Sequence, residues 1–250
     1  MIAPKTSTRA RHRVATLFSA VLVFASGAVA VAWLAPWGIG EPGGTRVSGR
    51  PATVYRAAVE ALAAAPGWLH TTVEWAANVA FLPLPLLLAG VWWSGRRNSP
   101  RPTAGALLTI LGTAVAFLSC SGLKLLVHEE RPCHDSSVPT LLACPAIGDW
   151  SFPSSNATII GALAAGLALT VPRLLPLVLP LAVAMASLRV FAGLHYAHDV
   201  AAGLVLGGTV TAVVMLVAMP ATVRLVDRFR RAGWSGPPGA PRRSRRLRAD

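Results

Sequence analysis

The chain has 250 residues, of which 54% are hydrophobic and only 13% are charged. This balance excludes an ordinary soluble multidomain protein and indicates an integral membrane protein. The formal net charge of +13 is compatible with nucleic-acid binding, but most of the excess flanks apolar segments, where basic residues set membrane topology. We therefore expect no nucleic-acid partner.

Six apolar segments are long enough to cross a bilayer, which predicts an all-α integral membrane bundle of six transmembrane helices. In chain order they are residues 14–34, 72–93, 103–127, 153–171, 174–192 and 200–222. They form one membrane domain, 14–222, between a basic N-terminus, 1–13, and a basic, largely disordered tail, 223–250. The first segment has the small residues of a signal-peptide cleavage site, but its long apolar run favours a retained helix.

Basic residues are distributed unevenly along these segments. With the N-terminus inside, 17 of the 23 lysines and arginines fall on the cytoplasmic side. The positive-inside rule therefore predicts a multi-pass cell-membrane protein with both termini in the cytoplasm. The loops after the first, third and fifth segments then lie on the extracytoplasmic side.

Two connecting regions carry further signals. Residues 52–65, in the first outer loop, are expected to form a short interfacial helix with Tyr55, Val59 and Leu62 on one side. Pro83 and Pro85 are expected to kink the second span.

The three cysteines differ in their expected surroundings. Cys120 lies within the third span and is expected to be a packing residue. Cys133 and Cys144 share an outer loop, where a disulfide and two free thiols are both compatible with the sequence. Two cysteines and scattered histidines do not form a zinc spacing, so no metal or other cofactor is expected.

Cationic and imidazole residues gather in three clusters at the ends of apolar segments. They are KLLVHEERP at 124–132, FPSSNAT at 152–158 and RVFAGLHYAHD at 189–199. Ionisable side chains are costly near a bilayer, so they mark functional sites. Lys124, Arg131 and Arg189 supply fixed positive charges, and Ser154 supplies a hydroxyl at a helix start. This combination predicts a site for a doubly charged tetrahedral anion on the extracytoplasmic face.

His195 and Asp199 are four residues apart, within reach of each other at the start of a helix. A carboxylate on one imidazole nitrogen fixes the tautomer and leaves the other nitrogen free to attack phosphorus.

The clusters resemble the three signatures of the type 2 phosphatidic acid phosphatase superfamily, membrane lipid phosphate phosphatases that share their fold with vanadium haloperoxidases. The first signature, Lys, six residues, Arg-Pro, is matched by Lys124, Arg131 and Pro132. The third, Arg, five residues, His, three residues, Asp, is matched by Arg189, His195 and Asp199. The Ser that often precedes this Arg is Leu188 here.

The resemblance implies a role for each matched residue. His195 would be the nucleophile that forms a phosphohistidine, and Asp199 would orient it. The phosphoryl oxygens would be held by Lys124, Arg131, Ser154, Ser155 and Arg189. Water would then hydrolyse the intermediate without a metal ion, so the implied activity is hydrolysis of a lipid phosphate.

The middle signature departs from the family. Its usual form is Pro-Ser-Gly-His, with the His protonating the leaving group, whereas this chain has Ser155 and Asn156 after Pro153 and Ser154. Asparagine cannot deliver a proton, and losing a general acid typically costs about 10²- to 10⁴-fold in rate.

A substrate with a good leaving group would account for this asparagine. A lipid diphosphate expels a phosphate monoester with a second pKa of about 6. A lipid monophosphate expels an alkoxide, which is about as basic as hydroxide, since the pKa of water is about 15.7. This difference favours a polyprenyl diphosphate over phosphatidic acid.

The sequence is also compatible with three alternatives. The proton could come from His198, His128 or His134. The protein could be a degenerate relative that binds a lipid phosphate without hydrolysing it. The phosphohistidine could also pass its phosphoryl group to an alcohol or sugar, which would make a phosphotransferase. A haloperoxidase is disfavoured because those relatives are soluble. The oligomeric state is not predicted.

Overall fold

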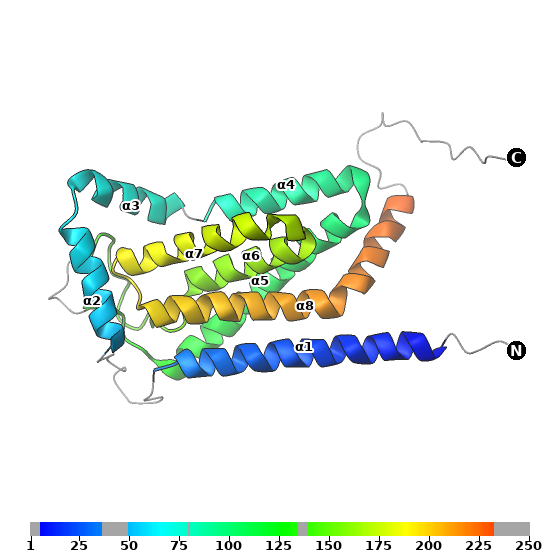
Figure 1. Ribbon diagram of the computed structural model, residues 1–250, viewed down its shortest axis with the longest axis horizontal. Coiled ribbons are helices and arrows are strands. Elements are labelled where there is room, and N and C mark those ends of the chain that lie inside the picture. Colours follow the sequence, from blue (N-terminus) through cyan, green and yellow to red (C-terminus); the bar gives the residue numbers. More distant parts are fainter. Residues whose placement is uncertain (1–5, 37–49, 80, 135–139, 233–250) are drawn as a thin grey trace, which may run out of the picture.

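α-Helices make up the chain in the computed structural model, which describes residues 6–36, 50–79, 81–134 and 140–232. The helices are α1 (Thr6–Leu34), α2 (Arg50–Ala63), α3 (Gly67–Val79), α4 (Pro83–Asn98), α5 (Pro100–Val127), α6 (Ser155–Thr170), α7 (Leu175–Phe191) and α8 (Ala197–Arg231). Two 3-10 turns, η1 (Pro132–His134) and η2 (Pro172–Leu174), precede the site loop and α7. Figure 1 shows α1, α5, α6, α7 and α8 running along the long axis of a bundle. The all-α prediction is confirmed.

Four of the described helices are long and apolar enough to cross a membrane by themselves: α1, α5, α7 with its preceding turn, and α8. The count of six spans is not confirmed. The fourth predicted segment forms α6, a shorter apolar helix of 16 residues. It can be short because it lies inside the bundle, where Ile160 and Leu167 are buried.

The predicted second span, 72–93, is bent near its prolines as expected, but its two parts are separate helices. That segment is divided between α3 and α4, which meet at an angle of 41° and together satisfy the criterion for a span. Pro83 is the first residue of α4, where its missing N–H and fixed φ are tolerated. The prolines thus begin a second helix where a kink within one helix was expected.

α6 and α8 are packed backbone against backbone. A Cβ atom at Gly207 would collide with the carbonyl oxygen of Thr158, and one at Gly203 would lie 2.5 Å from the carbonyl oxygen of Ser154. Only glycine permits this approach, which is typical of small-residue contacts between membrane helices. The contact holds the N-terminal ends of α6 and α8 together.

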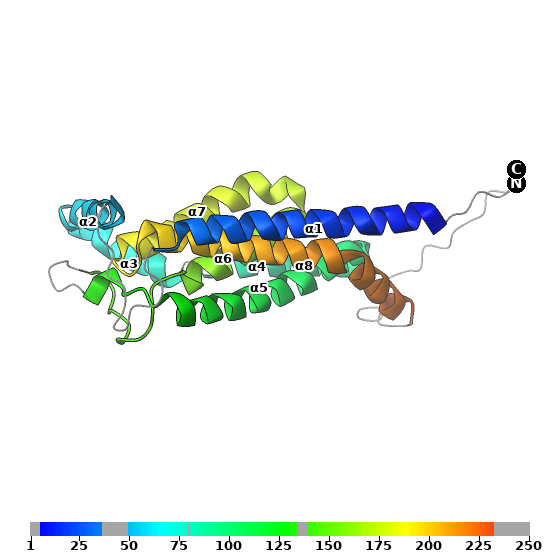
Figure 2. The ribbon, with the colours of Figure 1, turned by 90° about the horizontal axis from the view of Figure 1, so that it is seen from below.

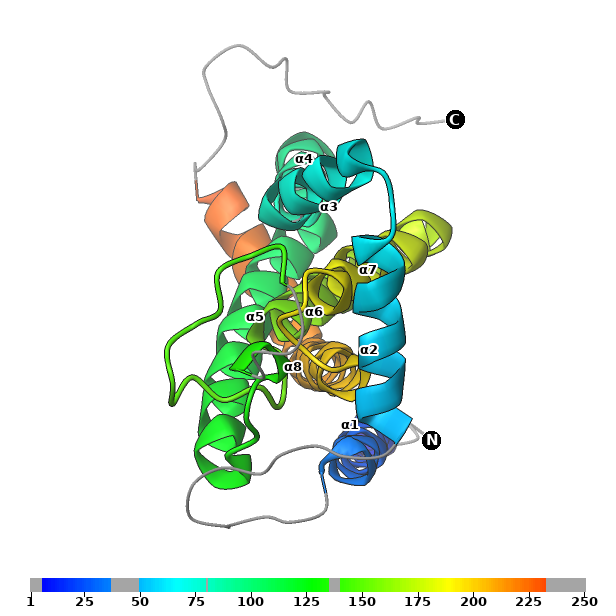
Figure 3. The ribbon, with the colours of Figure 1, turned by 90° about the vertical axis from the view of Figure 1, so that its left-hand side faces the viewer.

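α2 covers the turn between α7 and α8, as the view onto this end of the bundle shows (Figure 3). The expected face of Tyr55, Val59 and Leu62 is buried. The Tyr55 hydroxyl donates to the carbonyl oxygen of Gly193 at 3.1 Å, and its ring packs against Tyr196. Gly193 has φ +81°, a left-handed conformation that favours glycine. This residue allows the chain to turn from α7 into the site segment.

The two ends of the bundle differ in what they carry. The start of α1 and the end of α8 lie at one end, and α2 with the starts of α6 and α8 lies at the other (Figures 1 and 2). α8 contains Pro220 and continues as a helix to Arg231, so the predicted tail boundary at 223 falls within it. The predicted disorder of 233–250 lies outside the described residues.

Candidate active site

The three sequence clusters meet at the end of the bundle that α2 covers. The backbone N–H of Ser154, before α6, donates to the carbonyl oxygen of Asp199 in the first turn of α8 at 3.1 Å. The segment after α5 reaches the same point, since Arg131 Nη1 donates to the carbonyl oxygen of Leu194 at 3.2 Å. Residues far apart in the chain are therefore brought to one site.

The Nε2 atom of His195 faces a cation. Arg131 Nη1 lies 2.9 Å from His195 Nε2, and both side chains are buried. A guanidinium can only donate, so Nε2 accepts and carries no proton. This nitrogen keeps the lone pair that a nucleophile needs.

The Nδ1 atom of His195 faces a buried carboxylate and a hydroxyl. It lies 3.2 Å from Ser151 Oγ and 3.4 Å from Asp199 Oδ2. Ser151 Oγ in turn donates to Asp199 Oδ2 at 2.5 Å, and the Tyr196 N–H donates to the same oxygen at 2.9 Å. Asp199 thus holds the Nδ1–H tautomer both directly and through Ser151.

The surroundings keep the His195 imidazole neutral. Burial lowers the pKa of His195 to about 4, and the charges of Arg131 and Lys124 act in the same direction against the opposing effect of Asp199. Protonation would remove the lone pair on Nε2. The site therefore holds the ring in its nucleophilic form at neutral pH.

Two of the predicted phosphate-binding cations meet at one carboxylate. Asp149 Oδ1 lies 3.1 Å from Lys124 Nζ and 3.2 Å from Arg131 Nη2. Burial acts to raise the pKa of Asp149, but Arg131 and Lys124 outweigh it and hold that pKa below its usual value. Lys124 Nζ also donates to the carbonyl oxygen of Trp150 at 2.5 Å. The Asp149 carboxylate, 49% exposed, lies where these two cations would hold an anionic ligand.

Arg189 approaches the site from the end of α7. With the Asn156 amide oriented so that its oxygen faces Arg189, that oxygen accepts from Nε at 3.0 Å and Nη2 at 3.2 Å. Arg189 Nη2 also donates to the carbonyl oxygen of Ala77 at 3.4 Å, and its guanidinium lies 5.1 Å from the Phe81 ring centre. Asn156, which stands where the family has its acidic His, thus binds Arg189 of the third signature.

The predicted serines lie at the N-terminus of α6. The Ser154 hydroxyl accepts from the Ala157 N–H at 3.5 Å and caps the helix. Ser155 is half-buried, and its hydroxyl lies 3.6 Å from the thiol of Cys120. Cys120 is fully buried, as its expected packing role requires.

The three candidate acids occupy different places. His128 ends α5 and packs against Trp150, and His134 contacts the carbonyl oxygen of Pro145 at 3.0 Å. Only His198 joins the site network, with Nε2 3.2 Å from Asp199 Oδ1.

Three site residues were not predicted from the sequence: Ser151, Asp149 and Glu129. Ser151 and Glu129 are fully buried beside His195, Asp199 or His198. Asp149 and Ser151 lie in the loop before the second signature, and only their closeness to that signature would have indicated them. Glu129 lies inside the first signature, and a carboxyl at the end of an apolar segment was the only signal that could have indicated it.

Cys133 and Cys144 are joined in a disulfide, with Cα atoms 5.7 Å apart. This settles the choice between a bridge and two free thiols. The bridge links the turn after Arg131 to the segment that leads to Asp149.

A helical membrane bundle that gathers fixed cations around a neutral imidazole has the architecture of a membrane phosphatase. The chain belongs to the PAP2 superfamily, whose sequence profile matches residues 104–222. The predicted resemblance is thus confirmed, and the protein is a phosphoric ester hydrolase.

Named relatives agree with this assignment. The chain is 37% identical over 131 residues to decaprenylphosphoryl-5-phosphoribose phosphatase of Mycobacterium tuberculosis, covering 52% of this chain and 68% of that protein. It is 36% identical over 103 residues to lipid A 1-phosphatase of Rhizobium etli, covering 39% of this chain and 44% of that protein.

A solved structure shows the same fold. The chain resembles the PAP2 type phosphatidylglycerolphosphate phosphatase of Bacillus subtilis with a TM-score of 0.51 and 20% identity, covering 85% of this chain and 96% of that one.

Proposed function

We propose that this membrane phosphatase removes a phosphate from a polyprenyl-linked lipid, with a polyprenyl diphosphate as the preferred substrate, through a phosphohistidine on His195. The observation that carries the proposal is the pair of contacts on this imidazole. Its Nε2 accepts from Arg131, and its Nδ1 faces Ser151 and Asp199. Such a ring is oriented and neutral, and its Nε2 lone pair becomes free to attack when the Arg131 guanidinium donates to the phosphoryl oxygens instead.

The reaction has two steps. The lone pair of His195 Nε2 attacks phosphorus, the bond to the leaving oxygen breaks, and the leaving group departs with its electron pair. Water then attacks the phosphohistidine, which releases inorganic phosphate and restores the imidazole. Lys124, Arg131 and Arg189 stabilise the charge that develops on the phosphoryl oxygens, and Ser154 and Ser155 lie beside them.

The substrate class follows from Asn156 and from one relative. Because Asn156 binds Arg189 and cannot act as an acid, a leaving group that needs no proton is favoured. The name of the Mycobacterium tuberculosis relative describes a decaprenyl-linked substrate, which supports a polyprenyl tail.

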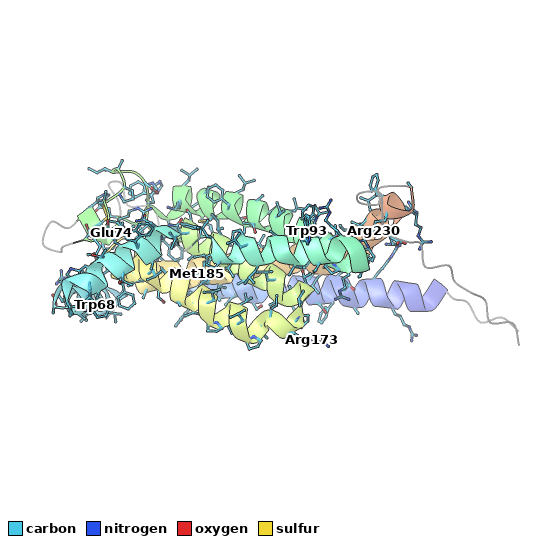
Figure 4. All side chains as sticks on the ribbon, turned by 90° about the horizontal axis from the view of Figure 1, so that it is seen from above. Trp68, Glu74, Trp93, Arg173, Met185 and Arg230 are labelled. Atoms are coloured by element: carbon cyan, nitrogen blue, oxygen red, sulfur yellow. A yellow bond between two sulfur atoms is a disulfide. The ribbon has the colours of Figure 1, made fainter. Side chains whose placement is uncertain are left out.

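The distribution of basic residues supports a site on the extracytoplasmic side of the membrane. The site end of the bundle is opposite the end that carries Arg173 and Arg230, as Figure 4 shows for these labelled residues. Basic residues favour the cytoplasmic side. We therefore place both termini in the cytoplasm and the site at the extracytoplasmic surface, where it meets lipid headgroups of the outer leaflet.

Phosphate release in detergent tests the proposal. Purified protein is compared on farnesyl diphosphate and dioctanoyl phosphatidate, with His195→Ala as the control. We expect faster turnover of the diphosphate and no release by the variant. Equal or reversed rates on the two lipids would contradict the diphosphate preference. Absence of release on every lipid phosphate would favour a binding protein instead.

Asn156→His gives a sharper test of the leaving group. Restoring an acid is expected to accelerate phosphatidate hydrolysis by about tenfold or more and to change diphosphate hydrolysis little. Asn156→Gln is the matched control, because it keeps an amide and adds no acid. If histidine accelerates both substrates equally, the leaving group does not explain Asn156.

A further inference from the structure

Glu129 is a fully buried carboxyl that the proposed reaction does not use. It follows α5, and its side chain has no exposed surface. Its two carboxyl oxygens lie 3.1 and 3.3 Å from Nε2 of His198 in α8. Its backbone oxygen accepts from the Ser151 N–H at 2.8 Å, so the same residue also fixes the serine beside His195.

His198 connects this carboxyl to the second oxygen of Asp199. Asp199 Oδ2 accepts hydrogen bonds from the groups around His195. Asp199 Oδ1 has no hydrogen-bond partner among the described residues and lies at an ion-pair distance of 3.2 Å from His198 Nε2. The ring of His198 is held in place by stacking against Tyr196 at 5.5 Å and Phe152 at 6.1 Å between ring centres. Asp199 therefore lies between two imidazoles, one on each carboxylate oxygen.

The cluster needs a shared proton. Two buried carboxylates and a neutral imidazole would place two negative charges in one small apolar volume, which is costly. The titratable groups that face Glu129 are His198 and Asp199, both in the first turn of α8. Burial raises the pKa of Glu129 to about 8, and the charge of Asp199 adds to this against the effect of His198. One proton between Glu129 and His198 lowers the cluster to a single negative charge.

The geometry argues against His198 as the direct donor to the leaving group. Its Nε2 faces the two carboxyl groups, and its Nδ1 is buried with no hydrogen-bond partner among the described residues. Neither nitrogen of the ring contacts Lys124, Arg131 or Arg189 in the described structure.

We propose that Glu129 and His198 are positioning residues for the phosphatase reaction: a buried pair with one shared proton that holds Asp199 Oδ1 and thereby keeps this carboxylate against His195. The proposal rests on the proposed function, in which His195 is the nucleophile. When the pair loses its proton, Asp199 loses its positively charged or neutral partner at Oδ1, and a second negative charge opposes the incoming phosphoryl anion. Turnover therefore falls on the alkaline side as this proton is lost.

The test is the pH profile of kcat and KM on farnesyl diphosphate in detergent. Wild type is expected to lose turnover as the pH rises through about 8, the value for Glu129. Glu129→Gln keeps a hydrogen-bonding amide without an ionisation, so its alkaline limb should move upward by about one pH unit or more. His198→Gln, which keeps an N–H donor, should behave in the same way. Glu74→Gln, an exposed change on α3, should match wild type.

A truncation separates positioning from substrate binding. His198→Ala should lower kcat about tenfold, which is typical when a buried polar group is left without its partner, with KM unchanged. A rise in KM at constant kcat would place His198 on the substrate and overturn the proposal. So would an alkaline limb that is the same in wild type, Glu129→Gln and His198→Gln.

Two further outcomes separate failure of the positioning proposal from failure of the proposed function. Loss of activity with a chelator and recovery with a divalent cation would make Glu129, His198 and Asp199 a metal site and overturn the shared-proton pair. If His195→Ala releases phosphate as fast as wild type, the proposed function fails. If that variant is inactive but the profiles do not differ, only the positioning proposal fails.

Discussion

The two sides of the His195 ring have opposite character. On the Nδ1 side, Ser151, Asp199 and Glu129 have no exposed surface. Ser151 donates to the Asp199 carboxylate and to the backbone oxygen of Glu129, and the Glu129 carboxyl contacts His198. On the Nε2 side, Lys124 and Arg131 bind an Asp149 carboxylate that is 49% exposed. The buried side is an acidic network with its partners in place, and the open side is a cationic one whose partner can be replaced.

The difference separates two tasks of the site. A fixed tautomer requires a network that does not rearrange between turnovers, and the buried hydrogen bonds to Asp199 Oδ2 provide it. Phosphate binding requires cations that can exchange one anion for another, and partial exposure allows this. Substitutions on the two sides should therefore affect different kinetic constants.

The largest effect is expected from breaking the buried side at its centre. Asp199→Asn should lower kcat by about 10⁴-fold, because an amide no longer selects the Nδ1–H tautomer, as known for a comparable His–Asp pair. His195→Ala should leave no trapped phosphoenzyme after an alkaline denaturing quench, under which a phosphohistidine survives. Trapped phosphohistidine at wild-type levels in Asp199→Asn would show that the carboxylate does not control attack.

Removing a cation on the Nε2 side of the ring should lower turnover less than Asp199→Asn does. Arg131→Gln removes one donor to the phosphoryl oxygens, and such losses typically lower kcat by about 10²- to 10³-fold. The matched control is Arg173→Gln, an exposed arginine at the other end of the bundle (Figure 4). Steady-state phosphate release measures both. Equal losses of turnover in the two variants would mean that Arg131 has no specific role in stabilising the phosphoryl charge.

Asp149→Asn should sharpen the contrast by freeing the cations. The native carboxylate competes with the substrate for Lys124 and Arg131, so its neutralisation should lower the inhibition constant of inorganic phosphate severalfold. Asp227→Asn, which removes an exposed carboxylate paired with Arg231, should leave that constant unchanged. A weaker affinity for phosphate in Asp149→Asn would instead assign Asp149 the task of holding the cations in place.

The smallest effect concerns stability. The pKa of Glu129 is about 8 in the folded protein and 4.5 for an unperturbed glutamate. Between these two pH values the folded protein keeps a proton that the unfolded chain has lost. The stabilisation linked to this proton is complete below about pH 4.5 and is lost as the pH approaches 8. The Tm of Glu129→Gln relative to wild type in detergent should therefore rise from pH 5 to pH 8. A constant difference would show that Glu129 is ionised throughout.

Much of the fold was predictable because apolar run length determines which segments enter a bilayer. The long helices α1, α5, α7 and α8 follow their predicted segments, except that α1 already begins at Thr6 and α8 runs on to Arg231. The division between α3 and α4 was not predicted. Hydropathy does not show whether proline residues kink one helix or begin another, since this depends on neighbouring packing.

The site was predictable where a motif fixes the spacing. Lys124, Arg131, Arg189, His195 and Asp199 were placed together from their signatures, and their roles remain predictions. Ser151 and Asp149 could not be found in this way, because they lie in a loop whose path depends on contacts with distant segments. The partnership of Glu129 with His198 joins residues 69 positions apart, which no local pattern reveals.

The backbone contact between α6 and α8 limits how the enzyme can open. Gly203 and Gly207 leave no side chain between these helices, so sliding one along the other would drive carbonyl oxygens into the opposing main chain. The starts of both helices must move as one rigid unit during catalysis. Admission of a headgroup then has to be accommodated outside this helix pair, for example by displacement of α2, and crosslinking α2 to α7 should slow entry without altering the chemical step.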